Sequence, residues 1–231
     1  MRLAHVRASR CALLIVLCAG PPLVWAQAGS DQFWPELDSY YSFNPRLRLA
    51  VDASRSTDGA SYSSIEVGPT FNIFARRFLQ PRITTPDQAK KNLLVFGVGY
   101  RYLAGINQSP ENRIELDVTP RIPLPWGILV GDRNRIDLRL IEGSGFSWRY
   151  RNRLSAQRTF RIHPFVFSPY VQGEIFYNSN PGRWNKTTVQ FGADVPFRKH
   201  FGFEPYYERD NNLGSVPSHV NAFGLTTSIH F

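Results

Sequence analysis

The chain has 231 residues and a formal net charge of +9, and 42% of its residues are hydrophobic. This length fits a single all-β domain. After the first 28 residues no apolar run reaches the roughly 18 residues of a membrane helix, so only closed β-sheet could place the rest of the chain in a bilayer.

The N-terminus has the pattern of a secretory signal peptide. Three arginines precede the apolar stretch Cys11–Trp25, and Ala26-Gln27-Ala28 has the form of a cleavage site. Val24-Trp25-Ala26 is an alternative site two residues earlier. We therefore expect residues 1–28 to be removed and residues 29–231 to form one domain. That domain lacks both cysteines of the chain and so contains no disulfide.

The remaining chain alternates apolar and polar residues with period two, and turn clusters separate the alternating segments. This pattern predicts eleven strands, at residues 33–42, 46–55, 62–74, 93–103, 112–121, 133–142, 145–156, 168–177, 187–196, 201–209 and 220–231. A short helix is predicted in the third connection, where Thr85 could cap it and Pro86 could begin a run to Lys91.

Charged residues keep to one face of these strands. The opposite face is apolar in the middle of every strand, and aromatic residues crowd the strand ends. This pattern is typical of a closed antiparallel transmembrane β-barrel, with its apolar face on lipid and its charged face inside. Nine arginines and nine acids are expected inside: Arg48, Arg101, Arg113, Arg121, Arg135, Arg139, Arg149, Arg151, Arg153, Asp52, Glu66, Glu115, Asp117, Asp137, Glu174, Asp194, Glu204 and Glu208.

The number of strands is the open point of this prediction. Bacterial single-chain barrels use an even number, with both termini on the periplasmic side. Two alternatives restore an even number. Either residues 33–42, which alternate weakly and contain Pro35, do not span the membrane and ten strands remain, or one strand has been missed and the barrel has twelve.

The last predicted strand, residues 220–231, gives a second indication of an outer-membrane barrel. Leu225, Ile229 and Phe231 share one face, and the chain stops on an aromatic residue. This ending resembles the assembly signal of Gram-negative outer-membrane barrels. The resemblance implies a bacterial outer-membrane location and recognition by the barrel-assembly machinery through these three residues.

Four further segments resemble an uncharacterised outer-membrane β-barrel family known as a domain of unknown function, the 2490 family. They are Phe33-Trp34-Pro35-Glu36-Leu37, Gly97-Val98-Gly99-Tyr100-Arg101-Tyr102, Tyr150-Arg151-Asn152-Arg153-Leu154 and Pro169-Tyr170-Val171-Gln172-Gly173-Glu174-Ile175-Phe176-Tyr177-Asn178. The resemblance covers nearly all of the mature chain and implies a location and a fold. It carries over no catalytic residue.

The interior charges suggest two functions. A central network is expected from Arg135, Asp137, Arg139, Arg149, Arg151, Arg153, Glu174, Glu115 and Asp117. Equal numbers of both signs favour a salt-bridged core that closes a small barrel. The alternative is a narrow, porin-like channel or a site for a small anionic solute, because the planar guanidinium of Arg149, Arg151 or Arg153 suits carboxylate and phosphate.

The net positive charge is expected in the turns, where it could contact anionic lipid or lipopolysaccharide phosphates. Nucleic acid is not an expected partner of an exported barrel. A lipid-modifying hydrolase is the rival class, since such enzymes need an outward Ser–His pair. The only pair on one strand face is Ser228 with His230, which points inward, so no catalytic residue is assigned. No motif with metal or cofactor spacing occurs, and none is expected.

Overall fold

The computed structural model describes residues 31–57, 63–77, 87, 89–106, 108–213 and 218–231. The expected signal peptide, residues 1–28, lies outside them. In the described part of the chain no helix is long and apolar enough to span a membrane.

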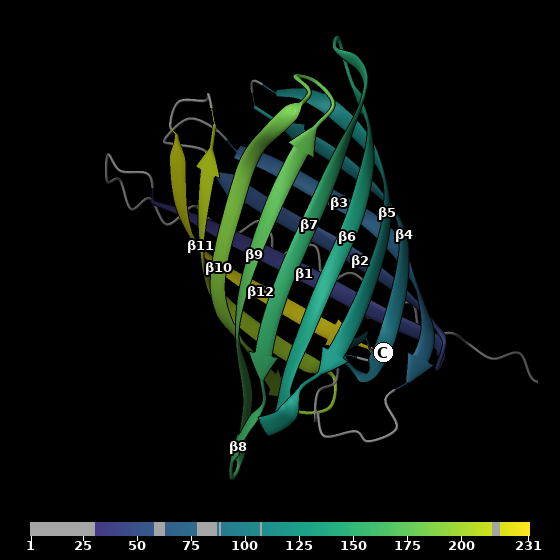
Figure 1. Cartoon of the computed structure of the whole chain (residues 1–231), viewed down its shortest axis with the longest axis vertical. Coiled ribbons are helices and arrows are strands. Elements are labelled where there is room, and N and C mark those ends of the chain that lie inside the picture. Colours follow the sequence, from purple (N-terminus) through teal and green to yellow (C-terminus); the bar gives the residue numbers. More distant parts are fainter. Residues whose placement is uncertain (1–30, 58–62, 78–86, 88, 107, 214–217) are drawn as a thin grey trace, which may run out of the picture.

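Eleven strands of 11 to 16 residues form one closed barrel (Figure 1). They are β1 Asp31–Asn44, β2 Leu47–Thr57, β3 Ser63–Arg77, β4 Asn92–Gly105, β5 Gln108–Pro123, β6 Ile128–Ile141, β7 Gly145–Arg158, β9 Phe165–Asn178, β10 Arg183–Phe197, β11 Phe201–Asn212 and β12 His219–His230. A short strand, β8 Phe160–Ile162, pairs only with β9 and extends below the barrel in Figure 1. The predicted all-β barrel is confirmed.

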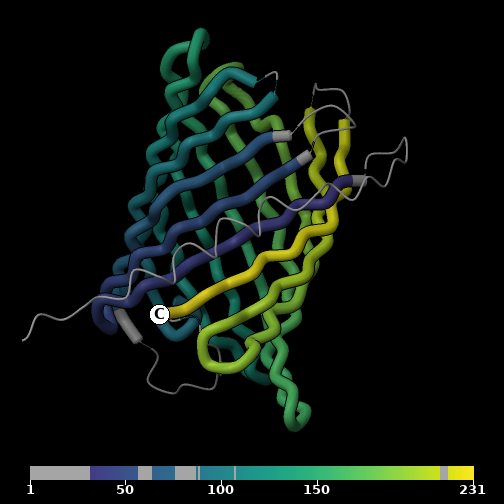
Figure 2. Tube along the Cα trace, turned by 180° about the vertical axis from the view of Figure 1, so that it is seen from behind, coloured from purple at the N-terminus to yellow at the C-terminus, as the bar shows by residue number. Residues whose placement is uncertain are grey.

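The barrel closes through a parallel pair, so the sheet is mixed. β1 runs beside β12 in the same direction, with Asp31 opposite Asn221 and Tyr40 opposite His230 (Figure 2). All other neighbours around the barrel are antiparallel. The expected even strand number was therefore wrong. An odd number of alternating strands must meet in parallel where the sheet closes.

The first strand spans the barrel wall despite Pro35. The register between β1 and β2 begins at Glu36, opposite Ser54. Pro35 therefore lies where β12 is the only neighbour that pairs with β1, and its missing N–H removes no bond to β2.

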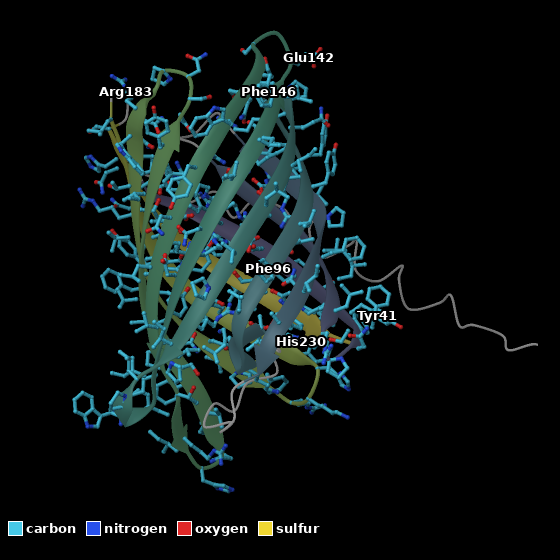
Figure 3. All side chains as sticks on the ribbon, turned by 45° about the vertical axis from the view of Figure 1, so that its right-hand side comes forward. Tyr41, Phe96, Glu142, Phe146, Arg183 and His230 are labelled. Atoms are coloured by element: carbon cyan, nitrogen blue, oxygen red, sulfur yellow. The ribbon has the colours of Figure 1, made fainter. Side chains whose placement is uncertain are left out.

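The parallel closure places Asp31 and Phe231 at opposite ends of the barrel, so the expectation that both termini share one end was wrong. Phe231 lies at the end that carries the β3–β4 connection, β8 and the short helix η5 (Pro125–Gly127). We call this the C-terminal end. The opposite end carries Glu142, Phe146 and Arg183 (Figure 3).

The wall is apolar outside and charged inside. Large side chains in mid-wall, such as Phe71, Val98 and Leu116, are 43% to 48% exposed, whereas Glu115 and Asp137 are at most 1% exposed inside. Phe96 marks the middle of this outer surface in Figure 3. Two aromatic residues near strand ends, Tyr40 and Phe74, face the interior and not the outer surface.

Candidate functional site

The barrel encloses a cavity of about 530 Å³, lined almost entirely by polar and charged side chains. Alternation along each strand turns these side chains inward. Their charges are not evenly mixed. Two ion-paired clusters occupy the wall from β2 to β9, and a group of acids occupies β11 and β1.

The first cluster centres on β5, and we call it the β5 cluster. Glu111 accepts hydrogen bonds from Arg113 and Arg139, and Glu115 lies 2.8 Å from Arg135. Arg101 hydrogen-bonds Asp52. The cluster consists of Asp52, Glu66, Arg101, Glu111, Arg113, Glu115, Asp117, Arg135 and Arg139. These contacts tie β2 to β6 along the inner wall.

The second cluster centres on β7, and we call it the β7 cluster. Glu174 of β9 accepts hydrogen bonds from Arg133, Arg151 and Arg153 at 2.8 to 3.1 Å. Arg149 binds Asp137 at 2.7 Å. The cluster therefore contains four arginines and two carboxylates, with two more positive than negative charges.

An aromatic ring supports two of these arginines. Phe176 is buried, and its ring centroid lies 5.6 Å from the Arg149 guanidinium carbon and 4.7 Å from that of Arg151. The ring holds both guanidinium groups beside their carboxylates.

The nine side chains expected in the central network all lie in these two clusters. Arg135, Arg139, Glu115 and Asp117 belong to the β5 cluster, and the remaining five belong to the β7 cluster. Within the β7 cluster, Arg151 and Arg153 bind Glu174. Arg149 binds Asp137, because these two residues lie directly opposite each other on β7 and β6.

Part of the β3–β4 connection crosses the lumen at the C-terminal end. We call Asp87 and η4 (Ala89–Lys91) the strap. Asp87 lies 2.6 Å from Arg48 of β2, Arg121 of β5 donates to the Ala89 carbonyl at 3.0 Å, and Lys90 lies 2.8 Å from Asp194 of β10.

The strap is held from three sides. Going around the barrel, its anchoring strands β2, β5 and β10 are three, four and four strands apart. Ala89 also packs against Phe74 and Val95 in a small buried apolar cluster. The strap therefore lies across the bore, and it lines the cavity at this end.

The strap and one other lysine correct the sequence analysis. Part of the positive charge that was expected in the turns lies inside instead, where Lys90 binds Asp194 and Lys186 binds Asp210. The expected helix is reduced to η4, and Thr85 and Pro86 lie outside the described residues.

Several interior charges were missed. Arg133 and Glu111 have the inward parity of their strands, but Arg133 is the first residue of its predicted strand and Glu111 lies one residue before the start of its own. Glu36 and Asp38 were missed because Pro35 weakened the first strand. Following the period-two alternation through and just past the ends of each predicted strand would have found Arg133 and Glu111.

Four acids on β1 and β11 form what we call the acid wall: Glu36, Asp38, Glu204 and Glu208. All four line the cavity. Among the residues that the structure describes, none of the four has a cation within ion-pairing distance. Glu204 accepts a hydrogen bond from Tyr170, and Asp38 accepts one from Tyr40.

His230 of β12 does not form the outward Ser–His pair that a lipid hydrolase needs. His230 stacks on Tyr40 at 4.8 Å between ring centroids and lies at the inner end of β12, so it forms no outward pair with Ser228. At the opposite end Ser218 Oγ lies 3.4 Å from His219 Nδ1, and both side chains are exposed. No group of three or more His, Cys, Asp or Glu is arranged to hold a metal within the described ranges.

The residues of the expected assembly signal lie along the outer and terminal part of β12. Phe231 is 65% exposed, and its N–H donates to the Tyr40 carbonyl at 2.9 Å across the parallel closure. Leu225 is also exposed, and Ile229 is half-buried opposite Phe201 of β11.

Comparison with known proteins gives one family. A search of curated proteins found no match. A family described as a protein of unknown function (DUF2490) matches residues 31–217, which include ten of the eleven barrel strands completely. The expected resemblance is thereby confirmed, and the chain belongs to the DUF2490 family of proteins of unknown function.

Proposed function

We propose that this protein is a bacterial outer-membrane β-barrel whose lumen is a polar chamber narrowed at one end by the strap. It is exported with a cleaved signal peptide, residues 1–28, and inserted by the barrel-assembly machinery through Phe231, Ile229 and Leu225. Its role is non-enzymatic, and the lumen admits only small polar solutes.

One observation carries this proposal: the barrel has the polarity of a membrane protein. Large apolar residues on nearly every strand face outward, while Arg113, Glu115 and Asp137 are buried inside. Leaving an apolar band of this extent in water is unfavourable, whereas a bilayer covers it. Closure of the sheet leaves no unpaired strand edge, as a lipid environment requires.

Two features of the lumen favour a narrow chamber over a wide pore. Arg149, Arg151 and Arg153 are engaged by carboxylates, and the strap crosses the bore. Exposed cations at the C-terminal end suit phosphate groups of lipid or lipopolysaccharide: Arg158, Arg161, Arg198 and Lys199.

Membrane insertion is the direct test. The mature chain, residues 29–231, is refolded with phosphatidylcholine vesicles and floated on a density gradient. We expect it to float with the vesicles and to resist extraction by carbonate. A folded protein that stays at the bottom of the gradient would refute the proposal.

The hydrolase alternative has one candidate pair in the described chain, Ser218 with His219. Release of fatty acid from phospholipid is measured for the wild type and for Ser218→Ala. We expect both to remain at the level of protein-free vesicles. Hydrolysis by the wild type that Ser218→Ala abolishes would establish the enzyme instead.

A further inference from the structure

We propose that the acid wall of the lumen binds a small cationic amine, with Glu36, Asp38 and Glu204 as its charged acceptors and Tyr206 as its aromatic contact. This proposal rests on the proposed membrane barrel and names the class of solute that its chamber takes.

The backbone register brings two of the acids into one row. Glu204 of β11 lies opposite Thr226 of β12, and Thr226 lies opposite Glu36 of β1. Neighbouring strands are about 4.8 Å apart, so the two glutamates stand roughly 10 Å apart with the short Thr226 side chain between them. Asp38 follows two residues along β1, on the same face. Three carboxylates thus converge on one patch of the cavity wall.

Hydrogen bonds hold these carboxylates without neutralising them. Tyr170 donates to Glu204 at 2.6 Å, and Gln190 donates to the Tyr170 hydroxyl at 2.8 Å. Thr226 donates to Glu36 at 3.3 Å. Hydroxyl donors orient a carboxylate but leave its negative charge uncompensated, so a cation entering the cavity finds preoriented acceptors.

The cavity also contains polar atoms whose hydrogen-bonding capacity is unused. Thr70 of β3 is only 6% exposed, and its hydroxyl has no hydrogen-bond partner among the described residues. The same holds for Asp38 Oδ1, which is buried. Thr70 and Asp38 line the same cavity, two strands apart, and the Thr70 hydroxyl lies over Gly99 of β4. Buried polar atoms are normally satisfied, so an unpartnered oxygen on the acid wall itself and a second one in the same cavity indicate a position for a polar ligand there.

An aromatic face completes the recognition of an amine. Tyr206 lies against Gly224 of β12, where an added Cβ would come within 1.9 Å of the Tyr206 Cζ atom. Glycine is thus required for the ring to lie flat on the wall, next to the row of Glu204 and Glu36. Ammonium groups bind both carboxylates and tyrosine faces.

The β7 cluster does not offer a comparable site for an anion. Arg151 and Arg153 are held by Glu174, so an anion would have to displace that buried carboxylate. The excess positive charge of the β7 cluster lies on arginines that already bind Glu174 or Asp137, whereas in the described part of the chain the acids of the acid wall have no cation at ion-pairing distance. A cationic solute would supply that missing counter-charge.

Spermidine is the probe, titrated by calorimetry into the refolded mature protein in the uncharged detergent dodecyl maltoside. We expect saturable binding to the wild type, and affinity lower by about tenfold or more in Glu36→Gln and Glu204→Gln, since each removes a charged hydrogen bond. Neither variant removes the partner of a cation, so both should fold, which circular dichroism checks.

Glu142→Gln is the matched control, because it makes the same change in charge at an exposed turn outside the cavity. It should bind spermidine like the wild type. Absence of binding to folded protein, equal binding by all variants, or binding of citrate in place of spermidine would each overturn the amine site. Vesicle flotation on the same preparation separates this failure from failure of the membrane barrel.

Discussion

At the scale of single residues, the lumen shows two carboxylates of the same type in opposite surroundings. Glu174 is 3% exposed and accepts hydrogen bonds from three arginines, whereas Glu208 lines the cavity without a cation at ion-pairing distance in the described chain. The alternation along the sequence turns both side chains inward and does not distinguish them. Only the register of the neighbouring strands decides which acid receives the arginines.

This difference predicts unequal stability. Glu174→Gln leaves three arginines without their common counter-charge and should lower the free energy of unfolding by about 3–5 kcal/mol. Glu208→Gln should leave the free energy of unfolding unchanged or raise it, because no ion pair is lost. Urea titrations of both variants in detergent, followed by tryptophan fluorescence, measure the difference. Equal losses would mean that the β7 cluster does not stabilise the barrel.

At the scale of the elements, strands were predictable from sequence and the strap was not. Period-two alternation located all eleven barrel strands, because each strand has one face inside and one outside. The strap carries no such pattern. Asp87 and Lys90 find their partners on β2 and β10 only through the closure of the barrel, which places strands distant in sequence around one bore.

Loosening the strap should widen the passage through the proposed chamber. The double variant Asp87→Asn, Lys90→Met removes its ion pairs to Arg48 and Asp194. We expect larger single-channel steps in planar bilayers than for the wild type. Lys199→Met removes an exposed charge at the same end and serves as the control. Identical conductance of the double variant and the control would show that the strap does not narrow the bore.

The strap should hold over a broad range of pH. Burial opposes ionisation of Asp87, but the charges of Arg48, Lys90 and Arg121 outweigh it and lower the Asp87 pKa below its ordinary value of 3.8. Burial also opposes the charge on Lys90, and Asp194, Glu204 and Asp87 raise its pKa above 10.5.

The stabilisation from Asp87 is present above its ordinary pKa and is lost as the pH falls through the lowered one, while that from Lys90 is lost only above its ordinary value. The difference in free energy of unfolding between the wild type and the double variant should therefore stay constant between about pH 5 and about pH 9. A change of this difference within that interval would show that other groups hold the strap.

At the scale of the whole molecule, the exposed apolar side chains around the middle of the wall form a belt. The cost of placing a charge on the outer surface should depend on how deep in this belt the charge lies. Leu116 lies in mid-wall, opposite Val98 and Ile136, and Ile162 lies on β8 beyond the wall. Both side chains are exposed. In phosphatidylcholine vesicles, Leu116→Arg should cost about 2–4 kcal/mol of folding free energy, and Ile162→Arg should cost close to nothing. Similar costs at both positions would contradict a membrane belt.

The fold was predictable from the sequence except at its closure. The direction of the last pairing is not a property of any segment. It depends on whether the total number of strands is odd or even, and the proline in the first strand obscured that number. The charges on the inner face could likewise be assigned strand by strand. Their separation into the β7 cluster and the acid wall depends on which strands become neighbours when the barrel closes.

The parallel pairing of β1 with β12 separates the two termini of the barrel, which an even number of antiparallel strands would place at the same end. If the barrel spans a membrane as proposed, Asp31 and Phe231 face different aqueous compartments. A reporter placed before Asp31 and one placed after Phe231 would respond to membrane-impermeant reagents added on opposite sides. No short linker could join the two ends into a circular chain, because it would have to traverse the full length of the bore.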